Sequence, residues 1–227
     1  MQNAPYTITL AVIKTNCFQE KIKLYYLKLK SHNMNKHTEK GIEEVKSLIE
    51  KKATDFKQHS IELLDAFWDS ENSIDFFSND TKLENYKVRH ISIVNGNLEV
   101  DLLEDVGEDG YGSLLIVFGD LIANRAIIVG EVIVMGSMKI EEIVMFENSS
   151  GDYLLSVGKD LIAKNYIEEE DNTDGIKGGF IVENKFPNDN STEILIPECT
   201  EYDGEYTFLK TEIIKERIKN KLPVFIK

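Results

Sequence analysis

The residues whose types and spacing suggest chemistry are two clusters of carboxylates in the middle of the chain. The first consists of Glu104, Asp105, Glu108 and Asp109, and the second of Glu168, Glu169, Glu170, Asp171 and Asp174. No Lys or Arg interrupts either cluster. Carboxylates at this density bind a hard divalent cation, attract a basic partner, or keep a loop hydrated.

Calcium is the first possibility, because Asp171-Asn-Thr-Asp174-Gly175 places oxygen ligands next to a glycine turn. The segment lacks the alternating ligands and the distal bidentate Glu of an EF-hand, and it does not follow the nonapeptide repeat of calcium-binding solenoids. We therefore predict no metal and no cofactor. Two interpretations of the nine carboxylates stay open, namely solvated surface loops and a docking surface for a basic protein partner.

Other catalytic or ligand-binding patterns are missing from the sequence. The four histidines have no zinc-site spacing, and His59 with Glu62 is more typical of a solvated helix face. There is no GxSxG and no GxxxxGK[ST], and the glycine-rich phrase beginning at Gly107 is acidic, so it would repel phosphate. A polysaccharide-degrading site would need basic residues to hold an anionic sugar. We therefore expect a protein that is not an enzyme.

The net charge of -14 is concentrated in one segment. Residues 1–100 carry 14 acidic and 14 basic side chains, residues 101–205 carry 24 and 6, and residues 206–227 carry 2 and 6. Binding of nucleic acid through the central segment is disfavoured, because phosphate affinity depends on Lys and Arg. A basic protein is the complementary partner, and an acidic surface that only keeps the protein soluble is the simpler alternative.

An internal repeat indicates the elements that must position these clusters. Residues 114–123 (LLIVFGDLIA) match residues 154–163 (LLSVGKDLIA) at seven of ten positions, with a constant offset of 40. Glycines such as Gly96, Gly119 and Gly136 recur at steps of 23 and 17, so the unit consists of two turns of about 20 residues. Short apolar runs separated by turn residues predict a right-handed β-solenoid, in which each turn buries its apolar residues against its neighbours. Each glycine is expected to take a positive φ at a corner, and the following Asp, Asn or Ser to cap the turn. The two acidic loops would then lie about three turns apart on one side.

The flanking segments are expected to be helical and to cap the solenoid. We expect residues 1–85 to form a largely helical capping region, 86–205 the solenoid, and 206–227 a C-terminal helix and tail. Within the first region, residues 7–30 slightly favour a strand. Apolar residues at helical spacing predict helices from about Thr38 and after His59. Residues 69–80 indicate a loop. The fold class is therefore mainly β with flanking helices.

The GDL-x-A turns, the acidic corner at residues 168–175 and the final Lys-Leu-Pro-Val-Phe (residues 221–225) resemble a bacterial family of small acidic β-solenoid proteins. Members are often labelled as related to bactofilins, and relatives occur among predicted immunity proteins of polymorphic toxin systems. The resemblance covers residues 86–227 and carries over no catalytic residue. It implies either a toxin-neutralising protein or a self-assembling scaffold.

These observations predict a protein-binding module that docks a basic partner through its acidic solenoid face, and the resemblance implies a toxin domain as that partner. The alternative is a bactofilin-like scaffold, so a homo-oligomer is possible. The two cysteines are far apart and form no CxxC, and no apolar run approaches a membrane span of roughly 20 residues. We expect a cytoplasmic protein that binds neither membrane nor nucleic acid.

Overall fold

The computed structural model describes residues 37–39, 41–53, 55–68, 74–105, 112–147, 155–168, 175–186, 194–204 and 207–226. The chain divides into two compact units, residues 1–37 and 38–227, and His37 is the only described residue of the first unit. The strand favoured for residues 7–30 lies outside the described residues.

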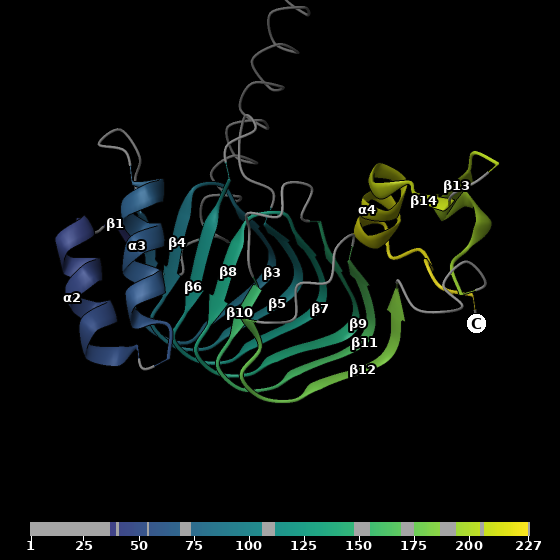
Figure 1. Cartoon of the computed structure of the whole chain (residues 1–227). Helices are drawn as coiled ribbons and strands as arrows, with labels where there is room; N and C mark the ends of the chain where they lie inside the picture. Colours follow the sequence, from purple (N-terminus) through teal and green to yellow (C-terminus); the bar gives the residue numbers. More distant parts are fainter. Residues whose placement is uncertain are drawn as a thin grey trace, which may run out of the picture. The chain divides into compact units, whose positions relative to one another are not determined.

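Residues 74–186 form a parallel β-solenoid of about five turns, which confirms the predicted fold class (Figure 1). Each turn contributes one short and one long strand, and from residue 74 on each strand pairs in parallel with its equivalent in the next turn. The short-strand sheet contains, in order, β1 (His37–Glu39), β2 (Ile74–Phe77), β4 (Ile91–Val94), β6 (Leu114–Val117), β8 (Glu131–Val134) and β10 (Leu155–Val157). The long-strand sheet contains, in order, β3 (Thr81–Val88), β5 (Leu98–Asp105), β7 (Leu121–Ile128), β9 (Met138–Phe146), β11 (Leu161–Glu168) and β12 (Phe180–Phe186).

The strand register explains the repeat of 40 residues. Ile91 pairs with Leu114, 23 residues on, and Leu114 pairs with Glu131, 17 residues on. The turns differ in the length of the connection that follows the long strand. In the shorter turns this connection has two residues (89–90 and 129–130), and in the longer turns it has eight (106–113 and 147–154). The repeat is therefore one basic turn alternating with one turn that carries an insertion.

Apolar side chains fill the space between the two sheets. The short strands are buried on both faces, so they appear in the sequence as continuous apolar runs such as Leu114–Val117. Their inward residues pack against inward residues of the long strands, and T-shaped aromatic pairs occupy the first turn (Phe77 and Tyr86) and the last turn (Tyr166 and Phe180). This stacking of like residues on like is the main source of stability in a solenoid.

The corner glycines stack on one another, but not for the predicted reason. Among the described glycines, only Gly204 has a positive φ. At Gly136, an added Cβ would lie 2.2 Å from Asp120 Oδ1 and 2.7 Å from the Gly119 carbonyl oxygen. Asp120 Oδ1 also accepts a hydrogen bond from the amide of Ser137 in the next turn, at 2.8 Å. The glycine is therefore required by the close approach of successive turns, and the predicted positive φ is wrong.

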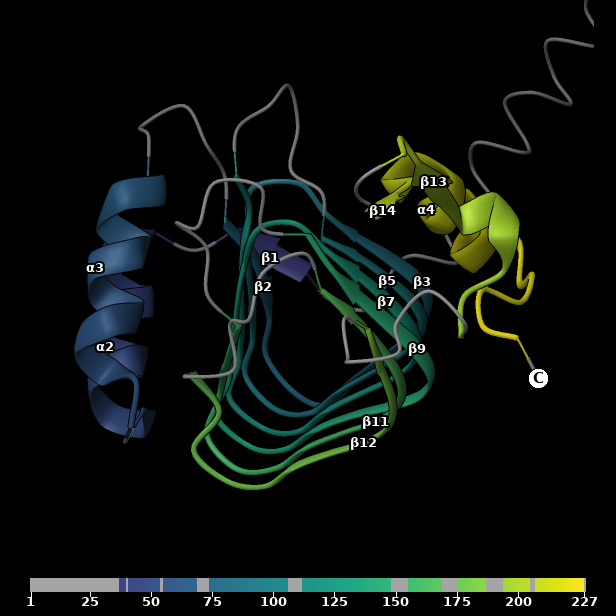
Figure 2. The same ribbon diagram turned by 45° about the vertical axis from the view of Figure 1, so that its right-hand side comes forward.

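Two helices cover the outer face of the short-strand sheet (Figure 2). α2 (Ile42–Lys52) and α3 (Lys57–Phe67) bury Val45, Ile49 and Leu64 against outward residues of the short strands. Lys46 Nζ of α2 lies 2.5 Å from Asp65 Oδ1 of α3, which ties the two helices together. Flanking helices were predicted, and the structure places them along a side of the coil.

The C-terminal segment covers part of the outer face of the long-strand sheet. It contains η3 (Pro197–Cys199), the antiparallel pair β13 (Thr200–Tyr202) and β14 (Thr207–Leu209), and α4 (Thr211–Lys219). Ile214 and Ile218 of α4 belong to one apolar cluster with outward residues of β5, β7, β9 and β11. Figure 2 shows α4 on the side of the coil opposite α2 and α3.

Two boundaries differ from the sequence interpretation. Residues 74–77, expected in a loop, form β2, and the parallel ladder therefore begins before the expected start at residue 86. Ile74, Phe76 and Phe77 are buried, so this short apolar run follows the same pattern as the other short strands. Within the described part of the chain, no helix is long and apolar enough to cross a membrane.

Candidate functional site

The insertions of the solenoid all leave from one edge of the long-strand sheet. β5, β9, β11 and β12 are parallel, so their carboxyl ends lie at the same edge. The connections that follow them are residues 106–111, 148–154, 169–174 and 187–193, which lie outside the described residues. We call these four connections the acidic edge.

The acidic edge has one sign of charge. Its sequences are VGEDGY, NSSGDYL, EEDNTD and PNDNSTE, which together hold nine carboxylates and no Lys, Arg or His. In solenoids, insertions that map to one face often form the binding face. The edge is therefore the first candidate for contact with another molecule.

Three of the nine predicted docking residues belong to the described strands. Asp105 and Glu168, the last residues of β5 and β11, are 0% and 1% exposed. Glu104 is partly exposed, and its Oε2 lies 2.6 Å from Lys219 Nζ of α4. Buried carboxylates cannot contact a partner, so Asp105 and Glu168 lie beneath the acidic edge and are not part of its surface. The other six, Glu108, Asp109, Glu169, Glu170, Asp171 and Asp174, lie outside the described residues.

Asp105 sits in a polar cluster inside the coil. It accepts a hydrogen bond from the hydroxyl of Ser113, and the carboxyl group of Glu131 is also buried nearby. Burial, with a smaller contribution from the charge of Glu131, raises the pKa of Asp105 to about 8. The acid at the base of the first insertion is therefore neutral at neutral pH.

Glu168 has a different environment, because an ion pair compensates its charge. Its Oε1 lies 2.7 Å from Lys185 Nζ on β12. The Lys185 side chain is 30% exposed and also lies over the ring of Phe180, with Nζ 5.4 Å from the ring centre. Lys185 thus brings a positive charge into the last turn of the coil.

α4 already docks on the long-strand sheet as a basic element. Lys215 pairs with Glu147, Lys219 with Glu104, and Lys221, just beyond the helix, with Asp101 at 3.2 Å. In the sequence, this positive tail was recognisable by its charge alone. The structure shows that acidic side chains beside the insertions are suited to hold lysines.

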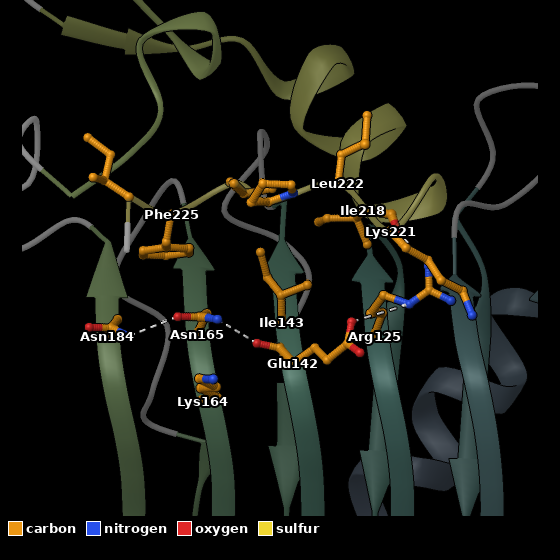
Figure 3. A pocket seen from close by; sticks show the side chains of 13 residues that line it. Arg125, Glu142, Ile143, Lys164, Asn165, Asn184, Ile218, Lys221, Leu222 and Phe225 are labelled. Carbon is orange, nitrogen blue, oxygen red and sulfur yellow. Dashed lines mark hydrogen bonds and ion pairs between the residues drawn. The ribbon is translucent and has the colours of Figure 1, made fainter.

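A second candidate is a groove between the long-strand sheet and the C-terminal segment (Figure 3). It has a volume of about 720 Å³. Its floor, which we call the polar row, consists of Arg125, Glu142, Lys164, Asn165 and Asn184, and its opposite wall is residues 221–226.

Hydrogen bonds connect the polar row across the strands. Asn184 Nδ2 donates to Asn165 Oδ1 at 2.9 Å, and Asn165 Nδ2 donates to the Glu142 carbonyl oxygen at 2.7 Å. β9 carries one extra residue at this point, since the register shifts between Ala123 and Arg125 of its neighbour β7. Such a bulge redirects side chains, and Figure 3 shows the Glu142 side chain reaching toward Arg125.

Arg125 anchors the C-terminal segment to the sheet. Its Nη1 donates to the carbonyl oxygens of Ile218 at 2.6 Å and Lys219 at 3.2 Å, at the end of α4, and its Nη2 donates to Asp101 Oδ2 at 2.5 Å. Hydrogen bonds from Asn124 and Lys221 and the charge of Arg125 lower the pKa of Asp101. Arg125 was not among the predicted site residues, although an arginine inside the apolar run LIANRAII indicates a buried charge that needs partners.

Metal ligation has no support among the described residues. No group of three His, Cys, Asp or Glu side chains there is arranged to hold an ion. Glu62, considered with His59 as a possible pair, accepts a hydrogen bond from Gln58 Nε2 at 2.8 Å instead.

The fold and these two candidate sites define a β-solenoid with lateral helices, an acidic edge and a polar groove. No protein-family model, curated protein or solved structure matches the chain. The resemblance to bactofilin-like proteins and to immunity proteins therefore stays a prediction.

Proposed function

We propose that the protein is a non-enzymatic binding module whose acidic edge docks a basic protein partner. One observation carries the proposal: β5, β9, β11 and β12 run parallel, so the four connections that follow them, with nine carboxylates and no basic residue, leave from a single edge. Self-repulsion at such an edge disfavours folding, whereas a cationic partner relieves it.

The docking of α4 on the same sheet supports this proposal. Lysines of the C-terminal segment pair with Glu147 and Glu104, which lie within two residues of the places where two insertions begin. A basic helix of another protein could repeat these contacts further along the edge. Long-range attraction would accelerate its capture and make the association sensitive to salt.

The family resemblance suggests a toxin domain as the first partner to test, and the cytoplasm as the location. In this proposal the module neutralises a basic toxin by covering its surface. The nature of the partner rests on the resemblance, whereas the sign of its charge rests on the acidic edge.

The test is co-purification from the native host at low salt and at about 0.5 M salt, where the Debye length falls to roughly 4 Å. The edge variant carries Glu108→Gln, Asp109→Asn, Glu169→Gln, Glu170→Gln, Asp171→Asn and Asp174→Asn. The control variant removes six exposed carboxylates elsewhere, with Glu→Gln at positions 43, 50, 62, 84, 183 and 198. We expect a stoichiometric basic protein that is lost at high salt and lost by the edge variant alone. Equal binding by wild type and edge variant would refute the proposal.

Self-association end to end is the second candidate. β12 ends the long-strand sheet, and its Ile181 is 56% exposed. Stacking on β3 of a second copy in continuous register would place Glu183 beside Glu84, because Asn184 and Asn85 share one row of the sheet. Like charges in that position oppose stacking. Sedimentation at high concentration tests it: assemblies that Ile181→Lys abolishes would favour the scaffold.

A further inference from the structure

β12 is the last strand of the long-strand sheet, and one of its two sides carries no further strand in the described part of the chain. Among the described residues, β12 pairs with β11 alone. Alternate backbone N–H and C=O groups of an edge strand point away from its neighbour, so a further strand can pair with them. We call this side of β12 its free side. Extended segments of partner proteins commonly add to a sheet at such a place.

The inward side chains of β12 are only partly covered. Phe180 and Val182 belong to the inner core of the coil, but both are partly exposed. Their counterparts on β11, Leu161 and Ala163, are 0% and 3% exposed. A further strand with apolar side chains at these two places would bury Phe180 and Val182 as β12 buries its neighbours, which is favourable.

The outward face next to the free side is also partly apolar. A hollow of about 520 Å³ lies over β9, β11 and β12, and Ile162 and Ile181 line it. These two isoleucines are in register, and Ile181 is 56% exposed. A third aliphatic side chain in the next place would extend this pair and cover Ile181.

Charged side chains alternate in sign at the bend of these three strands. Glu141, Lys164 and Glu183 follow one another across β9, β11 and β12 and line the same hollow. Glu183 is exposed. Opposite charges on neighbouring strands attract each other, so the free side favours a Lys or Arg beside Glu183.

The polar row ends at Asn184, on β12 (Figure 3). Its Nδ2 donates to Asn165 Oδ1 at 2.9 Å, which makes Asn184 Oδ1 the last acceptor of the row. The amide of an Asn in the next place could donate to this oxygen and continue the row.

The five preferences together describe a strand like β11. Its first five residues make this set of contacts from the other side of β12, and their sequence is Leu-Ile-Ala-Lys-Asn. A second copy of the chain fits less well, because β3 in continuous register would place Lys82 beside Ile181 and Glu84 beside Glu183.

We propose that the free side of β12 binds an extended segment of a partner protein, parallel and in continuous register, with an apolar–Ile–small–Lys–Asn pattern like that of β11. The inference does not depend on the acidic edge, because the residues of β12 itself form the site.

The test measures fluorescence anisotropy of a labelled peptide with the β11 sequence, LIAKNYIE, as the intact protein is added. A second peptide, LIAENYIE, reverses the charge opposite Glu183. The protein variants are Glu183→Lys and, as the matched control, Glu50→Lys, which makes the same change of charge at an exposed position of α2. Thermal unfolding verifies that each variant is folded.

N-methylated peptides separate strand pairing from other modes of binding, and they leave the protein unchanged. Successive N–H groups of a strand point to opposite sides, so methylation of one alternate set blocks pairing with β12 and methylation of the other set does not. We expect one of the two methylated forms of LIAKNYIE to bind and the other to lose binding. Equal binding of both forms would overturn the inference.

We expect LIAKNYIE to bind the wild type with a dissociation constant of about 100 μM or tighter. LIAENYIE should bind at least about threefold more weakly, Glu183→Lys should reverse this preference, and Glu50→Lys should retain it. The edge variant should keep its affinity for LIAKNYIE, which distinguishes this inference from the docking of a basic protein.

Three other results would overturn the inference. One is the lack of binding of LIAKNYIE at about 1 mM. Another is the same peptide preference in Glu183→Lys and in the wild type. The third is sedimentation of the protein alone as assemblies that Ile181→Lys disperses, because a second copy would then occupy the free side of β12.

Discussion

Asp105 and Glu168 occupy the same position in two different turns of the solenoid. Asp105 is in register with Ile128 of β7, Ile128 with Phe146 of β9, and Phe146 with Glu168 of β11. Both carboxylates point into the coil at the point where an acidic insertion begins. Burial keeps Asp105 neutral, whereas Glu168 forms an ion pair with Lys185. The charge of a buried carboxylate is therefore compensated in two different ways at equivalent positions.

The free energy of unfolding of Asp105→Asn should increase relative to that of the wild type as pH rises. The pKa of Asp105 is about 8 in the folded state, above its unfolded value of about 4, so its favourable contribution is complete below pH 4 and is lost as pH rises toward 8. The advantage of Asp105→Asn over wild type should therefore grow by about 1.4 kcal/mol per pH unit in that window. Urea unfolding at a series of pH values measures it.

Asp101 supplies the opposite control. Its pKa is lowered in the folded state, so its contribution is present at neutral pH and is lost as pH falls through its folded pKa. Asp101→Asn should be less stable than wild type at pH 7, and the difference should shrink in acid. Parallel pH profiles for the two variants would contradict this assignment.

The fold was predictable from the sequence because a solenoid repeats its register. The offset of 40 matches Leu115 to Leu155, and the two residues belong to one ladder through Val132; the apolar runs fix the strands. It was harder to predict which residues of the long strands face the interior of the coil and which face outward. Val100 and Leu103 both pack inside the coil, whereas Asp101 and Leu102 between them both lie on its outer side, so the period-2 alternation of β5 is broken at that point.

The candidate sites were predictable only in part. Charge counting located the acidic segments, but it could not show that Asp105 and Glu168 are buried, since burial depends on where each strand ends. The polar groove depends on contacts between residues about 90 apart in sequence, such as Arg125 Nη1 with the Ile218 carbonyl oxygen. No local pattern specifies such a contact.

Gly136→Ala should destabilise the solenoid strongly. The new methyl group would approach Asp120 Oδ1 and the Gly119 backbone at distances that no real Cβ adopts, so neighbouring turns must separate. We expect a loss of roughly 1–3 kcal/mol in the free energy of unfolding. Gly41→Ala is the control, because a Cβ there meets nothing within 4 Å, and we expect a change of about 0.5 kcal/mol or less. Equal effects in chemical denaturation would refute the close-approach argument.

Arg125→Met should release α4 without unfolding the coil. The substitution removes the donors to the carbonyl oxygens of Ile218 and Lys219 and leaves Asp101 without its arginine. Hydrogen exchange should show lost protection in residues 211–219 and retained protection in β4 to β8. Lys219→Met, which removes only the partly exposed pair with Glu104, should keep α4 protected. Uniform loss of protection in Arg125→Met would mean that the arginine stabilises the coil as a whole.

The ion pair between Glu168 and Lys185 should respond unequally to loss of either partner. The Glu168 side chain is 0% exposed and the Lys185 side chain is 30% exposed. Lys185→Met therefore strands a carboxylate inside the coil, with an expected loss of about 3 kcal/mol, whereas Glu168→Gln leaves a lysine that can turn toward water and should cost less. The double variant should recover part of the loss seen in Lys185→Met, because no buried charge remains. Denaturant unfolding of the three variants at neutral pH measures this, and additive losses in the double variant would show that the two side chains are not energetically coupled.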